Sequence, residues 1–370
     1  MMIPTGSIIG ILGGGQLGRM LSVAASRLGY HCHIYTPAPH SPAGEVSLHE
    51  TIADYEDGKA LANFAKQCDV ITYEFENVPA KTAALLADLC LLAPGAKALE
   101  IAQDRLHEKT FIVQEANVPV APFRPIEHME ALTQAIEALG LPCVLKTRRM
   151  GYDGKGQVII RRLEDAAAAF EQLGGRELIL EGFIPFAREI SIVAARTRTG
   201  DFKAYPPIEN VHKNHILHTS LCSAQPCSAQ SCAHTPSAPT NGTYLSASEL
   251  AQRIMSALDY VGIMATEFFE LADGSLMVNE IAPRVHNSGH FSQNAGCVDQ
   301  FEQHIRAICG WSLADMIPTH SVEMTNLIGH DMDDLTGWAA RPDCHIHLYG
   351  KSETRAGRKM GHVNRIIKPA

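Results

Sequence analysis

The start of the chain, an apolar run that ends in glycines and leads into a helical pattern, most restricts how this protein can fold. Residues 7–12 are predicted to form a buried strand, and apolar residues recur at helical spacing over 16–28. Strand patterns follow at 31–35 and 70–73, and a helix pattern at 81–89 begins just after a proline. Strands that alternate with helices in this order predict a parallel sheet with crossover connections.

A chain of 370 residues is too long for one compact core, so we expect several domains. The pattern predicts an N-terminal Rossmann-like α/β domain at 1–117 and a small α+β lid domain at 118–188. A larger C-terminal domain is expected at 189–370, with a subdomain at 321–370.

One segment, residues 220–241, is rich in Ser, Ala, Pro and Cys and has too little apolar surface to build a core. We therefore expect a solvated, mobile insertion. Cys222, Cys227 and Cys232 are spaced every five residues, with His234 nearby. That spacing matches no familiar zinc motif, so no metal site is expected here.

Composition restricts the partners and the compartment. The 31 basic and 40 acidic side chains give a formal net charge of −9, which argues against a nucleic-acid or anionic-membrane partner. No apolar stretch approaches eighteen residues, and the N-terminus resembles a strand more than a signal peptide. Ten cysteines without a CxxC pair favour reduced thiols and a cytoplasmic protein.

The first glycine-rich turn contains a GxGxxG pattern formed by Gly13, Gly15 and Gly18. Such a turn lets backbone amides approach a phosphate at a helix N-terminus, as in dinucleotide-binding enzymes. However, the second predicted strand ends near Tyr35 without the acid that would bind a ribose, and no arginine lies within 29–50 for a 2′-phosphate. A phosphate or substrate role is favoured over a purely structural turn, and both are favoured over a nicotinamide site.

A second glycine-rich loop follows a predicted strand that ends in Lys146. Residues 151–157 contain three glycines in seven residues. Such a loop can fold over a triphosphate and present amides and a lysine to it. It lacks the Ser or Thr of a Walker loop, and the alternative is an ordinary mobile surface loop.

A predicted hairpin carries two acids. Apolar patterns at 264–271 and 275–281 flank a turn at 273–274, and the pairing can place Glu267 beside Glu280. Two carboxylates that face triphosphate oxygens suit magnesium, which prefers hard oxygen ligands. The alternative, a solvated acid pair, is less favoured because charges within apolar strands need compensation.

Together these segments resemble the ATP-grasp superfamily, and within it the N5-carboxyaminoimidazole ribonucleotide synthase family. The resemblance covers almost the whole chain, and GYDGKGQ with YEFENV distinguishes it from the formate-using relative and from biotin carboxylase. The matching motifs are GGGQLGRM, YEFENV, QDRLHEK, GYDGKGQ, EGFI, ENVHKNHIL, NEIAPRVHNSGH and GRKMGH. The insertion at 220–241 departs from the family pattern.

The resemblance implies a three-domain ATP-grasp fold, a homodimer, and ATP with Mg²⁺ held by Glu267 and Glu280. Lys146 would hold phosphates, the EGFI segment would line the adenine, and Glu189 would bind the ribose. The implied ATP contacts are Arg105, Lys146, Gly151, Tyr152, Asp153, Gly154, Lys155, Gly156, Gln157, Glu181, Gly182, Phe183, Ile184, Glu189, His212, Asn279 and Glu280.

The implied reaction activates bicarbonate as carboxyphosphate and transfers the carboxyl group to the amine of 5-aminoimidazole ribonucleotide. Arg284 is the best candidate to hold bicarbonate, since a guanidinium fork matches planar oxyanions. Tyr152 and Asp153, in the closing loop, could shield the intermediate from water. Glu74 and Glu76 end a predicted strand, where open α/β sheets bind ligands.

The ribonucleotide phosphate is expected at a cation-rich segment near the C-terminus. Lys351, Arg358 and Lys359 lie within this segment of an otherwise acidic protein. We expect them to clamp the phosphate, with Gln16 and Leu17 closing from the first domain; the alternative is a solvated basic tail. Asn287, in the NEIAPRVHNSGH motif, is expected to contact the substrate.

Overall fold

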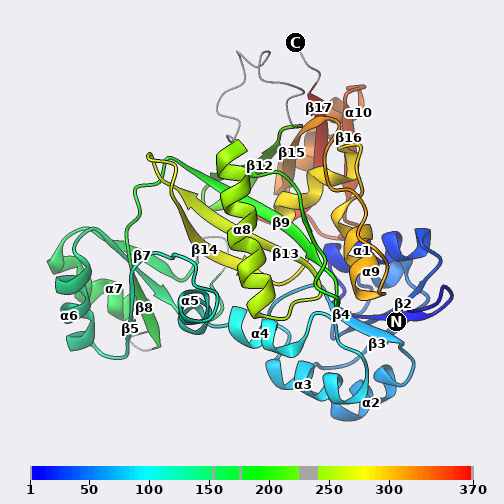
Figure 1. The fold of residues 1–370 in the computed structure, drawn as a ribbon, viewed down its shortest axis with the longest axis horizontal. Helices are drawn as coiled ribbons and strands as arrows, with labels where there is room; N and C mark the ends of the chain where they lie inside the picture. The colour runs from blue at the N-terminus through cyan, green and yellow to red at the C-terminus, as the bar shows by residue number, and fades with distance from the viewer. Residues whose placement is uncertain (1, 152–154, 175–176, 225–240, 368–370) are drawn as a thin grey trace.

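The computed structural model describes residues 2–151, 155–174, 177–224 and 241–367, which form three β-sheets (Figure 1). The sheets lie within residues 8–73, 123–182 and 188–367. The α/β and α+β fold class is as predicted, whereas the domain boundaries at 117 and 188 stay predictions. None of the helices in these ranges has the length and apolar composition needed to cross a bilayer.

The N-terminal sheet is parallel, with the strand order β3-β2-β1-β4. Its elements are β1 (Ile8–Leu12), α1 (Gln16–Arg27), β2 (His31–Thr36), η1 (Gly44–Val46), β3 (His49–Ile52), α2 (Gly58–Ala65), β4 (Val70–Tyr73) and α3 (Ala80–Leu89). The strands and helices predicted from periodicity are present. The edge strand β3 was missed because its side chains are only partly buried and show no apolar alternation.

Two helices connect this domain to the rest of the molecule, α4 (Ala96–Ala102) and α5 (Arg105–Gln114). The small sheet that follows is antiparallel, in the order β5-β8-β6-β7. It contains β5 (Phe123–Ile126), α6 (Met129–Leu139), β6 (Cys143–Thr147), β7 (Gln157–Ile160), η2 (Leu163–Asp165), α7 (Ala166–Gln172) and β8 (Leu178–Gly182). Figure 1 shows α5 between this small sheet and the central strands.

The large sheet has nine strands and is antiparallel. They are β9 (Arg188–Arg196), β10 (Phe202–Ala204), β11 (Ile208–Lys213), β12 (Ile216–Cys222), β13 (Gly262–Glu270), β14 (Leu276–Ala282), β15 (Ser321–Ile328), β16 (Cys344–Leu348) and β17 (Lys359–Ile367). The remaining elements are α8 (Asn241–Ala257), η3 (Asn287–Asn294), α9 (Gln300–Ile308), η4 (Gly329–Asp334) and α10 (Leu335–Ala339). Helix α8 crosses in front of β9 and β13 in Figure 1.

The predicted loop at 220–241 is corrected at both ends. Ser220 and Cys222 belong to β12, where Ser220 is buried and donates a hydrogen bond to Asn210 Oδ1 at 2.8 Å. Asn241 begins α8. The rest of the predicted insertion, 225–240 with Cys227, Cys232 and His234, lies outside the described residues.

The C-terminal cations do not form a free tail. Lys359 begins β17, which pairs with β15 on one side and with β16 on the other. The alternative of a solvated basic segment is therefore wrong for Lys359, because its backbone is part of the large sheet. Lys351 lies just before this strand and donates a hydrogen bond from Nζ to the Lys359 carbonyl at 2.7 Å.

Candidate active site

A cavity of about 850 Å³ is lined by residues from all three sheets. The predicted site residues on its wall are Gln16, Leu17, Glu74, Glu76, Arg105, Lys146, Gly151, Lys155, Gln157, Glu181, Gly182, Phe183, Ile184, Glu189, His212, Glu267, Asn279, Glu280, Arg284, Asn287 and Lys359. Gly156, Lys351 and Arg358 do not line it. Tyr152, Asp153 and Gly154 lie outside the described residues. The fold thus brings together segments that are far apart in the chain.

The β13–β14 hairpin places two acids side by side. Glu267 and Glu280 are paired residues in the ladder, as the predicted hairpin requires, and the register shifts just after Glu267. Burial, and then repulsion from Glu280, raise the pKa of Glu267 to about 8. Two like charges at this position therefore lack enough positive compensation, and a divalent cation would supply it.

The donor set fits magnesium only together with a ligand. Among the residues that the structure describes, no three His, Cys, Asp or Glu side chains form a cluster suited to a metal. Glu280 contacts Arg105 at 3.2 Å, and Glu267 contacts His286 at 3.3 Å. The two carboxylates could bind one hard cation whose remaining positions are filled by phosphate oxygens or water.

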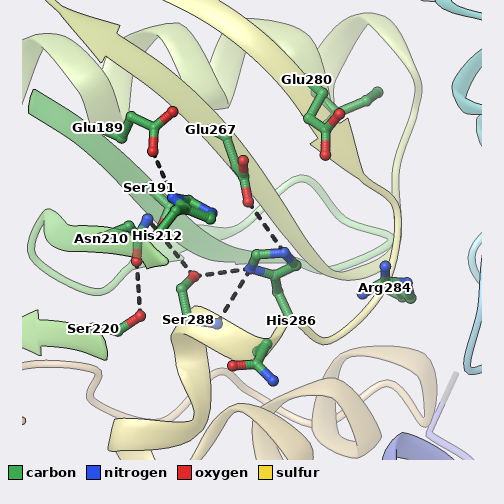
Figure 2. A network of polar contacts seen from close by, with 12 residues as sticks. Glu189, Ser191, Asn210, His212, Ser220, Glu267, Glu280, Arg284, His286 and Ser288 are labelled. Carbon is green, nitrogen blue, oxygen red and sulfur yellow. Dashed lines mark hydrogen bonds and ion pairs between the residues drawn. The ribbon is translucent and has the colours of Figure 1, made fainter. Parts of the chain in front are cut away.

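A chain of buried polar side chains leads to His286 (Figure 2). Ser220 donates to Asn210, whose amide nitrogen donates to Ser191 Oγ at 3.0 Å. Ser191 then donates to Ser288 Oγ at 2.8 Å, and Ser288 Oγ lies 2.9 Å from His286 Nδ1. Because Ser288 already accepts from Ser191, its own proton is available for His286.

This chain determines which nitrogen of His286 carries the proton. The Ser288 backbone N–H also points at Nδ1, at 3.3 Å, and an amide can only donate. Nδ1 is therefore an acceptor, and neutral His286 has its proton on Nε2, the atom that faces Glu267. Burial, and then the charge of Arg284, hold the pKa of His286 well below its usual value, so the ring is a neutral donor at the cavity wall.

Glu189 and His212 form a pair on the cavity wall beside Glu267 (Figure 2). His212 Nδ1 lies 2.5 Å from Glu189 Oε2. Burial lowers the pKa of His212, but the hydrogen bond and the charge of Glu189 outweigh it, and the net pKa is raised. Both residues project from neighbouring strands, β9 and β11, which are paired next to this point.

An apolar slot lies beside these charges, and sequence reasoning missed most of it. Phe186 and Phe269 stack with ring centroids 4.7 Å apart and 9° between their planes. Val144, Ile159 and Phe183, the last of which was predicted, line the same cavity. Such a slot suits a flat heteroaromatic base. The sequence could have indicated Phe269, because it lies two residues after Glu267 on the same strand and its side chain therefore projects from the same face.

The first glycine-rich turn is occupied from within the protein. Glu74 accepts hydrogen bonds from the amides of Gly15, at 2.6 Å, and Gly18, at 2.9 Å. Gly13 has φ +109°, and a Cβ there would lie 2.3 Å from Glu74 Cγ, so the glycines make room for this carboxylate. A dinucleotide pyrophosphate needs amides at this helix N-terminus. Because Glu74 already takes two of them, the structure does not favour the nicotinamide alternative.

Glu76 connects the first domain to the end of the β13–β14 hairpin. Arg284 forms a two-pronged ion pair with it, in which Nη2 donates to Oε1 at 3.0 Å. Burial raises the pKa of Glu76, but the charge of Arg284 outweighs it and lowers the pKa overall. Arg284 thus faces the cavity with a carboxylate bound where a planar oxyanion would fit.

The three C-terminal cations lie near one another, and Lys359 lines the cavity. Burial, and then the charge of Arg358, lower the pKa of Lys351 to about 8, with Lys359 contributing further repulsion. Lys359 lines the cavity, while Arg358 donates from Nη1 to the Glu353 carbonyl at 2.8 Å. Neighbouring cations whose charge lowers the pKa of Lys351 favour an anionic ligand at this point.

Comparisons with known proteins cover nearly the full chain. Residues 7–103 match the ribonucleotide synthetase preATP-grasp domain, 111–301 the ATP-grasp domain, and 323–369 the phosphoribosylaminoimidazole carboxylase C-terminal domain. The chain is 47% identical over 363 residues to N5-carboxyaminoimidazole ribonucleotide synthase of Brucella melitensis, covering 98% of this chain and 96% of the relative.

Two solved structures are also similar. N5-carboxyaminoimidazole ribonucleotide synthetase from Thermus thermophilus is 43% identical, with a TM-score of 0.87 and coverage of 97% of this chain and 93% of the other. N5-carboxyaminoimidazole synthase from Aspergillus clavatus, in complex with ADP and 5-aminoimidazole ribonucleotide, is 28% identical. Its TM-score is 0.88, with coverage of 99% and 94%.

Proposed function

The chain belongs to the N5-carboxyaminoimidazole ribonucleotide synthase family of ATP-grasp enzymes, and we propose that it carboxylates 5-aminoimidazole ribonucleotide with bicarbonate and ATP. The products are N5-carboxyaminoimidazole ribonucleotide, ADP and phosphate, in purine biosynthesis. One observation carries this proposal: a single cavity joins a paired-acid hairpin, a phosphate-type lysine, apolar side chains and Lys359 of the C-terminal cations.

ATP binding uses the part of the cavity between the small sheet and the hairpin. The apolar slot at Phe186 and Phe269 takes the base, and Glu189 binds the ribose hydroxyls. Lys146 exchanges its bond to Glu181 for the nucleotide phosphates. Glu267 and Glu280 would hold magnesium, which neutralises charge on the triphosphate and on the transferring phosphoryl group when bound.

Bicarbonate is a weak electrophile, so it must first be activated. Its oxygen attacks the γ-phosphorus, the bond to ADP breaks, and carboxyphosphate forms. Arg284 holds the planar oxyanion in place of Glu76. The neutral His286 donates a hydrogen bond from Nε2 toward Glu267 and so keeps that carboxylate in position. These residues position the reactants and stabilise charge, which is the main task in phosphoryl transfer.

The amine of the ribonucleotide then attacks the carboxyl carbon, the bond from that carbon to the phosphate oxygen breaks, and the nitrogen passes its proton to the departing phosphate. Lys351, Arg358 and Lys359 provide positive charge for the ribonucleotide phosphate, and Gln16 and Leu17 close the site from the first domain. A monophosphate carries about two negative charges and needs such cations. Asn287, paired with Asn326 through two amide hydrogen bonds, faces the same space.

The resemblance also supports a cytoplasmic homodimer that acts on small molecules, without a nucleic-acid or membrane partner. Sedimentation equilibrium over a range of protein concentrations measures the oligomeric state. A monomer at all concentrations would contradict the homodimer.

The activity is tested by following phosphate release with ATP, ¹³C-bicarbonate and the ribonucleotide. We expect ATP hydrolysis that requires both other substrates, and ¹³C on the exocyclic nitrogen of the product. Nicotinamide absorbance is recorded in the same cuvette, because turnover there without ATP use would support an oxidoreductase. ATP binding without turnover would instead indicate a catalytically inactive nucleotide-binding module.

A further inference from the structure

Three charged side chains meet in the interior behind the ATP site: Lys109 of α5, Lys146 of β6 and Glu181 of β8. Lys146 Nζ lies 2.8 Å from one Glu181 oxygen, and Lys109 Nζ lies 3.5 Å from the other. The side chains of Lys109 and Glu181 are only 1% and 3% exposed. Lys109 also donates to the Asn279 carbonyl at 3.0 Å, on the strand that carries Glu280.

The two lysines differ in what they can reach. Lys146 and Glu181 line the cavity, so Lys146 can turn to a nucleotide phosphate. Lys109 is not on the cavity wall and stays between β8 and β14. When Lys146 leaves Glu181, the charge that remains against this buried carboxylate is that of Lys109, with Arg105 farther away.

A buried carboxylate in this position depends on its counter-ions. Burial raises the pKa of Glu181, but Lys109, then Lys146, and more weakly Arg105 outweigh it and lower the pKa to about 2. Losing a partner from such a buried ion cluster leaves an uncompensated charge, which is strongly unfavourable. One of the two lysines therefore has to stay in place during the catalytic cycle.

Building on the proposed function, we propose that Lys109 is a positioning residue of the ATP site, the fixed counter-ion that holds Glu181 in place while Lys146 turns to the nucleotide. Lys109 touches neither nucleotide nor reacting atoms. It connects the segment that begins at Glu181 with Asn279 and so sets the distance between the base slot and the magnesium strand.

Helix α5 keeps Lys109 still. Its N-cap, Asp104, accepts from Arg148 Nε at 3.0 Å and Nη2 at 2.8 Å, which ties the helix to the small sheet. Glu108 accepts from the Ile281 amide at 2.7 Å, and Arg105 contacts Glu280, which tie it to β14. The helix is thus held on both sides of the cavity, and Lys109 projects from a rigid support.

The test is Lys109→Met, which keeps the length and removes the charge. We expect the Michaelis constant for ATP to rise about tenfold or more, with a much smaller change in that for the ribonucleotide. A new ionisation should also appear in the pH dependence of ATP binding: the defect should shrink as pH is lowered, because a protonated Glu181 leaves no uncompensated charge when Lys146 turns to ATP. A pH profile that superimposes on the wild type would overturn the proposal.

The matched control is Glu181→Gln, alone and combined with Lys109→Met. The double variant has no carboxylate to titrate, so the new ionisation should disappear and its profile should follow that of Glu181→Gln. If the ionisation persists there, it belongs to another group and the assignment is wrong. If Lys109→Met fails to fold and the double variant also fails, Lys109 is a structural residue only.

ATP affinity is also measured by calorimetry without the ribonucleotide, on the full-length protein. Binding that weakens in Lys109→Met with the same pH dependence supports the inference even if the acceptor in the proposed function is wrong. Conversely, wild-type turnover with unchanged ATP binding in Lys109→Met would sink the inference and leave the function standing.

Discussion

Two cationic side chains on the cavity wall are already paired with carboxylates of the protein. These carboxylates have the same negative charge as the proposed substrates. Glu76 holds Arg284 where bicarbonate is expected, and Glu181 holds Lys146 where a phosphate is expected. Substrate binding at these points exchanges one anion for another, so the two cations, Arg284 and Lys146, stay paired throughout. Selectivity then depends on how well the substrate's geometry replaces that of a carboxylate.

Glu280→Gln should lower kcat by about 100-fold or more while the far-ultraviolet circular dichroism spectrum stays the same. The change keeps the size of the side chain and removes one of two anionic ligands for the cation. Asp273→Asn, at the exposed turn of the same hairpin, is the control and should retain activity. Wild-type activity and magnesium dependence in Glu280→Gln would show that the metal lies elsewhere.

The phosphate site should lose affinity at high pH. Lys351 has a pKa of about 8 because it is buried beside other cations, so above pH 8 it loses its proton and the cluster loses one charge. We expect kcat/KM for the ribonucleotide to fall above about pH 8, while kcat/KM for ATP stays level there. Lys351→Arg, which keeps its charge, should abolish this fall; the same fall in the variant would assign it to another group.

At the scale of elements, α5 joins the small sheet to the β13–β14 hairpin, and this connection starts at Asp104. Its carboxylate caps the helix by accepting from the amides of Leu106 and His107. It also pairs with Arg148 and Arg149. The first role needs an oxygen atom, and the second needs a negative charge, so two substitutions can separate them.

Asp104→Asn should keep the cap and lose the ion pairs, whereas Asp104→Ala loses both. The alanine variant should therefore be less stable than the asparagine variant by about 1 kcal/mol, the usual contribution of an N-cap. Urea unfolding measures both, and Asp88→Asn, at an exposed position of α3, is the control. Equal stability of the two Asp104 variants would mean that the cap contributes nothing.

At the scale of the whole molecule, buried neutral histidines hold the sheets together. His304 of α9 accepts from the Ile263 amide at Nδ1, at 3.1 Å, so its proton is on Nε2 and is donated to Thr72 Oγ1 at 2.8 Å. One imidazole thus links β13 of the large sheet to β4 of the N-terminal sheet. Burial lowers the pKa of His304 to about 3.

This linkage predicts acid sensitivity. Above pH 6.5 His304 is neutral in the folded and in the unfolded protein, so it has no effect on stability. Below pH 6.5 the unfolded chain binds a proton at His304, whereas the folded protein does not. The free energy of unfolding should therefore fall on acidification, with His304 alone accounting for about 2 kcal/mol at pH 5. In His304→Gln the loss between pH 7 and 5 should be smaller by that amount, while exposed His320→Gln should match the wild type. An unchanged loss in His304→Gln would contradict the assignment.

Features with a local pattern were predictable from the sequence alone. The parallel sheet follows from strand and helix periods, and the facing acids of the hairpin follow from a turn flanked by two alternating strands. Each depends on residues within one or two neighbouring elements. The exposed strand β3 was missed, and the polar start of the 220–241 segment was misassigned as loop, because their local patterns are weak.

Only the tertiary structure decided which charges meet. Glu74 takes the amides of a turn 59 residues away, and Arg284 pairs with Glu76 across 208 residues. Lys109 reaches Asn279 across 170 residues. A local period carries no information about such contacts, because they depend on how the sheets and α5 pack. The residue types of the site are thus written in the sequence, whereas packing decides their partners, and with them their protonation.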